Sequence, residues 1–231
     1  MIFTNRHKLP PLVAAALSND RYDAGDCDFS VTTLLKPPYQ VQLQRQHHDE
    51  ITEDVMDRAY SIRGQGVHSV LERIPSTLPV MREVRLYATI HGVTISGQLD
   101  VYDFERKEIS DYKEISASGV IYGKPEHEQQ LNMLAYLARQ YGLEVRGLYN
   151  VLFVRDWMGS GDKRKGYPKT PIIVKARRVW GLDEINEFLA GRIAAHTTPA
   201  EQMSRCDETW GGRRCKNYCN VSQFCRWLKE G

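Results

Sequence analysis

The stretch VRLYATIHGVTISGQLDVYDFERKEISDYKEI, residues 84–115, decides the fold. It consists of short runs rich in β-branched and aromatic residues with polar residues among them, which is typical of half-buried strands. His91-Gly92 and Glu105-Arg106-Lys107 interrupt these runs, as turns do. We predict a three-stranded antiparallel meander over residues 81–115, because such short connections join neighbouring antiparallel strands.

The patterns on both sides of this meander predict a mixed sheet covered by helices. Apolar residues recur at helical spacing before and after it, and two further β-rich runs follow. The expected helices are residues 49–73, 127–141 and 183–195, and the further strands are residues 145–155 and 171–180. A short helix is also expected in the apolar run Leu12–Leu17, and an interrupted one over residues 30–43. This order of elements favours an α/β fold with a mixed central sheet.

Length and charge narrow the function classes. The 231 residues suffice for one domain with a small appendage, and we place the core at residues 1–200 and a cysteine-rich cap at residues 201–231. The net charge of +2 excludes the strongly basic field of a passive nucleic-acid coat, so any nucleic acid would be held by local patches. No run of about 18 apolar residues predicts a transmembrane helix, and the N-terminal apolar run is too short for a secretory signal. We therefore expect an intracellular, cytoplasmic protein of cellular or viral origin.

Asp100, Asp111 and Lys113 are the candidate catalytic residues. Side chains alternate along a strand, so Asp111 and Lys113 share a face, and an antiparallel hairpin would bring Asp100 beside them. Two carboxylates can hold a divalent cation such as Mg²⁺, which activates water and stabilises charge on a phosphate. A neighbouring lysine can orient or deprotonate that water. Taken alone, two aspartates and a lysine in this pattern more often belong to the solvated face of a sheet. The surrounding sequence therefore decides whether they indicate a catalytic site.

Two further blocks give the pattern its context. GQGVHSVLE, residues 64–72, lies on a predicted helix upstream, and QLNMLAYL, residues 130–137, lies on a predicted helix downstream. Together with GQLD and DYK they resemble the RecB-like branch of the PD-(D/E)XK nucleases. That branch has a G-x-x-x-H helix, then G-x-x-D, then (D/E)-x-K, then a Q-x-x-x-Y helix, in this order. The resemblance covers about residues 28–140 and implies a restriction-endonuclease-like core, with a mixed central sheet flanked by helices.

The resemblance also implies a metal site. Carried over position by position, it makes His68, Asp100 and Asp111 ligands of Mg²⁺ or Mn²⁺, with the carbonyl of Tyr112 as a further ligand. Lys113 matches the catalytic lysine of the family. A lone histidine on a helix is more often a packed or surface residue, so the expected role of His68 depends on this ordered set of motifs.

The downstream helix matches the family only in part. Gln130 matches the glutamine that supports the site and the DNA end. Leu134 stands where the family usually has tyrosine, and Tyr136 is two residues out of register, on another face of the helix. This tyrosine therefore does not match the family pattern, whereas the residues predicted to form the metal site do.

The cysteines predict a second metal centre. Cys27 stands alone, whereas Cys206, Cys215, Cys219 and Cys225 crowd the C-terminal end with the spacing C-x8-C-x3-C-x5-C. Such a cluster in a reducing compartment points to a metal rather than to disulfides, and thiolates suit both zinc and iron–sulfur clusters. CKNYCNVSQFC, residues 215–225, resembles the element that binds a [4Fe–4S] cluster in the CRISPR-adaptation exonucleases and AddB-type proteins. The resemblance implies such a cluster, with Zn²⁺ as the alternative; Cys206 is the expected remaining ligand and Cys27 the less favoured one.

A basic loop is the candidate nucleic-acid contact. Lys163, Arg164 and Lys165 form its densest basic spot, and Tyr167 follows as a stacking platform. Single-strand binders combine basic grooves with aromatic side chains in this way. A glycine-flanked charged run is more often a solvated hairpin turn, and we slightly favour that interpretation.

These features predict a metal-dependent deoxyribonuclease. The resemblance implies an exonuclease acting on single-stranded DNA ends, with DNA and recombination or replication proteins as partners and no membrane. The alternative is a non-catalytic nucleic-acid-binding or assembly subunit of such a complex that retains the nuclease fold. A third interpretation joins a four-cysteine zinc module to an unrelated α/β enzyme.

Overall fold

The chain divides into two units, described here within residues 1–19, 24–75, 77–159, 162, 164–207 and 209–229 of the computed structural model. The sheet unit comprises Ala24–Val31 and Arg63–Leu189. The cysteine unit comprises Met1–Asp23, Thr32–Ile62 and Ala190–Gly231. All the nuclease-like motifs fall in the sheet unit, and the clustered cysteines fall in the cysteine unit.

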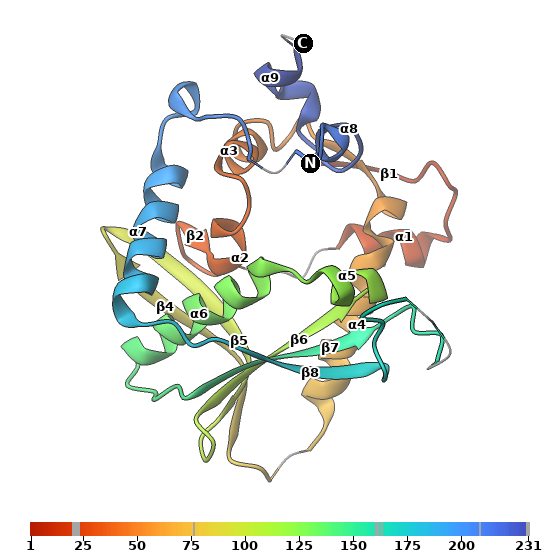
Figure 1. Ribbon diagram of the computed structural model, residues 1–231. Helices are drawn as coiled ribbons and strands as arrows, with labels where there is room; N and C mark the ends of the chain where they lie inside the picture. Colours follow the sequence, from red (N-terminus) through yellow and green to blue (C-terminus); the bar gives the residue numbers. More distant parts are fainter. Residues whose placement is uncertain (20–23, 76, 160–161, 163, 208, 230–231) are drawn as a thin grey trace. The chain divides into compact units, whose positions relative to one another are not determined.

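Six strands form one mixed sheet in the sheet unit (Figure 1). Their order is β2-β5-β6-β7-β8, and β4 also pairs with β5. The predicted meander is confirmed, because β5 is antiparallel to both β4 and β6. The predicted mixed sheet is confirmed too, since β7 is parallel to β6 and antiparallel to β8. The strands are β2 (Phe29–Ser30), β4 (Val80–Ile90), β5 (Val93–Asp103), β6 (Glu108–Ile115), β7 (Gly147–Val154) and β8 (Ile172–Arg177).

The pairing of β5 with β6 is short and leaves an opening beside Asp100. Only residues 101–103 of β5 pair with β6, and nearer its N-terminal end β5 pairs with β2 through Ile95 and Ser96. Along this edge of the described sheet, residues 97–100 lie between the two pairings. The backbone amide of Tyr112 in β6 donates a hydrogen bond of 2.6 Å to the Asp100 side chain instead. The Asp100 carboxylate therefore accepts the hydrogen bond that a backbone carbonyl of β5 would accept if the pairing with β6 continued.

Helix α6 covers this part of the sheet (Figure 1). It begins with a proline at its first position, where the missing amide hydrogen costs nothing, and its leucines are buried. Its approach to the sheet requires Gly97, because a Cβ atom there would lie 2.6 Å from Leu134 Cδ2 and 2.9 Å from Leu137 Cδ1. The helices with residues in this unit are α4 (Ala59–Arg73), α5 (Ala117–Tyr122), α6 (Pro125–Gln140) and α7 (Leu182–Thr197).

The cysteine unit is built from short elements around a small core. Tyr39, Leu43, Ile51, Met203 and Val221 form that core. The C-terminal segment is thus packed against α3, although the predicted domain boundary at residue 200 stays a prediction. Besides the first turn of α4 and the C-terminal half of α7, the elements with residues in this unit are β1 (Ile2–Thr4), α1 (Pro11–Ser18), α2 (Val31–Leu34), α3 (Pro38–Gln46), β3 (Thr52–Asp54), the 3₁₀ turns η1 (Val55–Arg58), η2 (Ala200–Gln202) and η3 (Ser222–Phe224), α8 (Arg213–Asn217) and α9 (Arg226–Lys229).

The predicted helix over residues 49–73 is wrong in its first part. Thr52–Asp54 forms β3, which pairs in parallel with β1, and α4 begins only at Ala59. Asp54 ends the strand: its carboxylate accepts from Thr4 Oγ1 at 2.8 Å and from the Met56 amide at 3.1 Å. Ile51 in this stretch is buried in the core of the cysteine unit, and β3 pairs with a strand distant in the sequence; local periodicity reveals neither contact.

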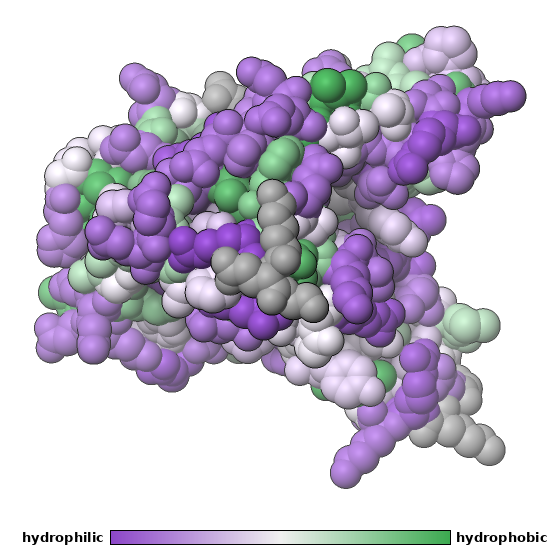
Figure 2. Space-filling view, turned by 90° about the horizontal axis from the view of Figure 1, so that it is seen from above, coloured by the Kyte–Doolittle hydropathy of each residue, from purple (hydrophilic) through white to green (hydrophobic). Residues whose placement is uncertain are grey.

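One face of the molecule is largely polar. The face shown in Figure 2 is mainly hydrophilic, and the hydrophobic residues on it are scattered in small groups. Among the described residues, none of the helices combines the length and apolar character needed to cross a membrane.

Candidate functional site

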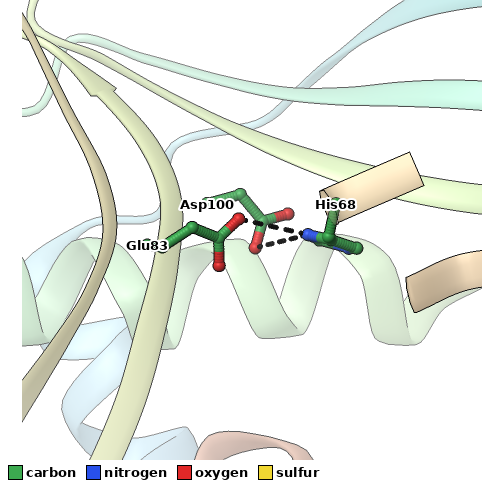
Figure 3. A group of neighbouring side chains, drawn as sticks. All are labelled: His68, Glu83 and Asp100. Carbon is green, nitrogen blue, oxygen red and sulfur yellow. Dashed lines mark hydrogen bonds and ion pairs between the residues drawn. The ribbon is translucent and has the colours of Figure 1, made fainter. Parts of the chain in front are cut away.

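His68, Glu83 and Asp100 bring their polar atoms together within the sheet unit (Figure 3). His68 comes from α4, Glu83 from β4 and Asp100 from β5. His68 Nδ1 lies 3.3 Å from Glu83 Oε1 and 3.8 Å from Asp100 Oδ1. One ligand atom from each residue lies within 4.8 Å of the other two, and no other set of three His, Cys, Asp or Glu in the described structure does so.

Glu83 is the member of this cluster that the sequence analysis missed. Arg82 pairs with Val101 and Val84 with Leu99, so Glu83 stands opposite Asp100 across the two strands. Its φ of 52° is unusual for a non-glycine residue and marks a local distortion of β4. A signal was present in the sequence, since counting back from the His91-Gly92 turn places residue 83 opposite residue 100.

A polar network holds Glu83 in place. Gln98 Nε2 donates to Glu83 Oε2 at 2.5 Å, and Arg85 donates to Gln98 Oε1 at 2.9 Å. Burial opposes the charge on Glu83, but the bonds from His68 and Gln98 outweigh it and lower the pKa of this carboxyl. The bond with Glu83 in turn raises the pKa of His68 against the effect of burial. Both changes favour a charged pair in the absence of a metal.

Asp100 is buried and strongly perturbed. Burial, and then the neighbouring Asp111, raise its pKa to about 7, while Lys113 and His68 act in the opposite direction. Without a bound cation, ionising both of these neighbouring carboxyl groups costs free energy. A buried carboxyl group with a raised pKa beside a second carboxylate is a candidate cation ligand, and Asp100 meets this description.

Asp111 and Lys113 lie on the same strand as predicted and are in contact. Lys113 Nζ donates to Asp111 Oδ1 at 2.7 Å, and Asn150 Nδ2 donates to Asp111 Oδ2 at 2.7 Å. Asn150 is fully buried, and Arg177 Nε donates to its Oδ1 at 2.7 Å. Burial works against the charge on Lys113, but Asp111 and Asp100 outweigh it and raise its pKa. The lysine is therefore an ammonium at neutral pH.

Tyr112, Asp111 and Gln130 are the other predicted site residues around this group. The Tyr112 amide binds Asp100, and its ring meets the His68 ring edge-on with centroids 6.2 Å apart. Asp111 neighbours Asp100 but lies outside the three-residue group of His68, Glu83 and Asp100. Gln130 is half-buried on α6, and no hydrogen bond joins it to the cluster in the described part of the chain. Its metal-supporting role stays a prediction.

The donor set fits a divalent cation. It offers an imidazole nitrogen and carboxylate oxygens, and hard cations such as Mg²⁺ and Mn²⁺ prefer oxygen with at most a few nitrogen ligands. Asn150 and the Tyr112 amide fix the orientation of the two aspartates. Such supporting bonds are typical of ligands that are held ready for a metal.

The clustered cysteines lie close enough to one another to interact electrostatically. Cys206, Cys219 and Cys225 pack against the core of the cysteine unit, and all of the described cysteines are free thiols. Burial raises the pKa of Cys206, and the charges of Cys219, Cys225 and Cys215 add to this. No three of these sulfurs lie within 4.8 Å of one another. Mutual repulsion of thiolates at this range is what a bound metal would relieve.

Cys27 belongs to the other unit and has its own partners. Its Sγ lies 3.2 Å from Ser96 Oγ and 3.3 Å from the Ala24 carbonyl oxygen. These local bonds account for the partly buried thiol without a metal. Its predicted role as a substitute ligand stays the less favoured one.

The basic loop is internally paired. Arg164 forms an ion pair with Asp162 at 2.9 Å, and its guanidinium lies over the Tyr167 ring at 4.8 Å. The Tyr167 hydroxyl accepts from the Met158 amide at 2.7 Å. Lys165 is exposed, and Lys163 lies outside the described residues. The tyrosine is thus part of the loop packing, and nucleic-acid contact by this loop stays a prediction.

Comparison with known proteins supports the fold. No protein-family model and no curated protein matches the sequence. The crystal structure of SSO0001 matches over 93% of this chain and 92% of its own, with a TM-score of 0.60 and 17% sequence identity. The chain resembles SSO0001 in fold. Because the mixed sheet flanked by helices is shared with SSO0001, the predicted fold class is confirmed, whereas the cysteine-bound cap stays a prediction.

Two other solved structures are less similar than SSO0001. A phage-related exonuclease from Haemophilus somnus 129PT has a TM-score of 0.34 and 12% identity, covering 84% of this chain and 83% of its own. A protein from Eubacterium rectale, provisionally named an exonuclease, has a TM-score of 0.37 and 11% identity, covering 87% and 73%. TM-scores this low do not support a conclusion about fold or activity.

Proposed function

We propose that the chain is a divalent-metal-dependent nuclease. The observation that carries this is the meeting of Asp100, Asp111 and Lys113 beside His68 and Glu83 in one small volume. The order of motifs in the sequence supports the same function. A solvated sheet face would not bury Asp111 to 2% exposure or raise the pKa of Asp100 to about 7.

His68, Glu83, Asp100 and Asp111 would hold the cation. When bound, Mg²⁺ or Mn²⁺ supplies Lewis-acid chemistry, which makes water a better nucleophile and stabilises charge on phosphate oxygens. The fit depends on the imidazole and carboxylate donors and on the polar network behind them. Glu83 extends the predicted ligand set, because its carboxylate faces the same histidine nitrogen as Asp100.

Lys113 would act as a cation rather than as a base. Its ammonium is bound to Asp111 and its pKa is raised, so it does not give up its proton at neutral pH. It can donate a hydrogen bond to an attacking water or to a phosphate oxygen and stabilise the developing negative charge. Asn150 and Arg177 keep the Asp111 carboxylate oriented toward it.

The finer function rests on the resemblance to the RecB-like nucleases. It is hydrolysis of DNA by an exonuclease at single-stranded ends, in association with recombination or replication proteins. The test is cleavage of end-labelled single- and double-stranded DNA and of RNA, with Mg²⁺, Mn²⁺ or EDTA, by wild type and Lys113→Ala. We expect metal-dependent shortening from one end that the variant loses. Metal-dependent cleavage at internal positions would retain the nuclease and overturn the exonuclease assignment.

One observation favours the alternative of a non-catalytic subunit. Both oxygens of Asp111 are engaged by Lys113 and Asn150, as in a structural ion pair. The same assay decides between the two functions. Folded wild-type protein that binds DNA but leaves it intact with either metal would establish the binding subunit.

We also propose that Cys206, Cys215, Cys219 and Cys225 hold a [4Fe–4S] cluster, with Zn²⁺ as the alternative. Support comes from the packing of Cys206, Cys219 and Cys225 on the core of the cysteine unit. Burial, and then the neighbouring cysteines, also raise the pKa of Cys206 and of Cys219. The metal would crosslink the C-terminal segment to itself where it packs against Tyr39 and Leu43 of α3. Protein purified without oxygen should absorb near 400 nm and contain iron, and Cys206→Ser should lose both while Cys27→Ser keeps them. Bound zinc without this absorbance would replace the cluster by zinc.

A further inference from the structure

Basic side chains form a row across the sheet beside Asp111. Asp111 in β6 pairs with Asn150 in β7, and Asn150 pairs with Lys175 in β8. Residues paired across neighbouring strands point to the same face of a sheet. Arg177, two residues further along β8, points to that face as well, as its bond to Asn150 shows. Asp111 is thus followed across the sheet by two half-buried cationic side chains.

The first turn of α6 is anchored against the end of this row. Glu128 accepts hydrogen bonds from the Trp180 ring nitrogen at 2.9 Å and from the Arg178 amide at 3.3 Å. These bonds fix the start of the helix to the chain that leaves β8. They place His127, which precedes Glu128, next to the basic row.

His127 is buried without a partner for its Nδ1 atom. Only 9% of the residue is exposed, and the described part of the chain offers this nitrogen no hydrogen bond. Burial first, and then the charges of Lys113, Lys124, Arg177 and Lys175, lower the pKa of the imidazole to about 3. An unpaired buried polar atom is costly, so it indicates a group that meets its partner only on binding.

Positive charge exceeds negative charge around His127. Lys113 is matched by Asp111, and Arg177 donates to the neutral Asn150, with Glu128 and Asp111 as the carboxylates that act on its charge. Neither Lys124 nor Lys175 has a carboxylate partner among the residues that the structure describes. Half-buried cations that repel one another cost free energy unless an anion joins them. The excess charge and the unpaired imidazole share one location, and a phosphate group would satisfy both.

We propose that His127, Lys175 and Arg177 form a phosphate-binding subsite that holds a nucleic-acid backbone phosphate adjacent to the one at Asp111. This inference rests on the proposed nuclease function for the identity of the ligand, but not for the existence of the anion site. An imidazole N–H and the two cations would donate to the phosphate oxygens. The subsite would align the strand across β6, β7 and β8, so that the next phosphate reaches Lys113.

Lys175→Ala tests the subsite best, because no side-chain hydrogen bond or ion pair joins Lys175 to Asp111 or to its strand partner Asn150 in the described structure. The exposed Lys169→Ala, which removes the same charge outside β8, is the matched control. Binding of a fluorescent single-stranded oligonucleotide is measured by anisotropy in EDTA, over a series of salt concentrations. We expect Lys175→Ala to weaken binding about 5- to 10-fold and to reduce the slope of log K against log salt by about 0.7, with Lys169→Ala close to wild type.

A second measurement follows His127 directly. Inorganic phosphate added to protein with ¹⁵N-labelled histidine should shift the His127 ring resonances, and Lys175→Ala should weaken this response. Circular dichroism checks that the variants are folded. No response of His127 to phosphate or to the oligonucleotide would overturn the subsite. Equal affinity and equal salt slope for Lys175→Ala and Lys169→Ala would do so as well.

The outcomes separate this inference from the proposed nuclease. If Lys175→Ala weakens oligonucleotide binding while wild type cleaves nothing, the phosphate subsite stands and the nuclease assignment fails. If wild type cleaves DNA and Lys175→Ala binds and cleaves equally well, the nuclease stands and the subsite is wrong.

Discussion

Asn150 Nδ2 donates a 2.7 Å hydrogen bond to Asp111 Oδ2 across the parallel strands β6 and β7. This amide occupies one oxygen of the carboxylate and leaves the other to Lys113. Neither partner of the bond is exposed by more than 2%. The orientation of the carboxylate is therefore fixed by a residue that lies outside every motif of the sequence.

We expect Asn150→Ala to lower metal affinity and cleavage about 10- to 100-fold, as loss of a bond that orients a ligand typically does. Titration with Mn²⁺ and the rate of DNA cleavage measure the effect. Tyr149→Phe is the control, because this neighbour points to the other face of β7 and bonds to Glu108. Equal losses in both variants would assign the effect to damage of the strand.

Glu83→Gln should weaken Mn²⁺ binding about 10-fold while leaving the fold intact. The substitution removes the negative charge next to His68 but preserves the side-chain size and an oxygen that can accept from Gln98. Calorimetry or electron paramagnetic resonance of bound Mn²⁺ gives the affinity. Glu72→Gln, at an exposed position one turn after His68 on the same helix, should leave the Mn²⁺ affinity unchanged. An unchanged affinity in Glu83→Gln would exclude Glu83 from the ligand set.

Gly97→Ala should destabilise the protein by about 1 to 3 kcal/mol, because its Cβ atom would overlap Leu134 and Leu137. Gly64→Ala is the matched substitution on α4, where a Cβ atom meets nothing within 4 Å. It should raise the free energy of unfolding by up to about 1 kcal/mol through helix propensity. Urea denaturation measures both, and opposite signs are the expected result.

Acid should destabilise the protein partly through His196, which is 4% exposed. Burial, and then the charge of Arg192, lower the pKa of its imidazole from the ordinary 6.5 to about 4. Because the pKa of His196 is depressed in the folded state, its contribution to stability is complete above pH 6.5 and is lost as the pH falls from 6.5 through about 4. The shift corresponds to about 3 kcal/mol. In denaturant titrations between pH 7 and pH 4, His196→Gln should flatten this dependence; an unchanged profile would contradict the assignment.

Local patterns in the sequence predict the meander, α6 and the nearby strands, because alternation and helical spacing are properties of neighbouring residues. They also predict Asp100, Asp111 and Lys113 as candidate site residues, whereas His68 follows only from the resemblance to the RecB-like nucleases. The contacts of Glu83 and Asn150 are not local: they follow from strand register. The pairing of β1 with β3 is missed for the same reason, since nothing within either short segment specifies its partner.

The site depends on a crossover connection. Asp111 and Asn150 are 39 residues apart in sequence, and the chain between them must form α5 and α6 before β7 can pair in parallel with β6. During synthesis, the residues of all four nuclease-like motifs leave the ribosome before Asn150 does, since translation proceeds at about 5 to 20 residues per second from the N-terminus. A nascent chain therefore contains the acidic and lysine motifs before it contains Asn150, which orients Asp111. The order of translation delays the assembled centre until most of the sheet unit has been made.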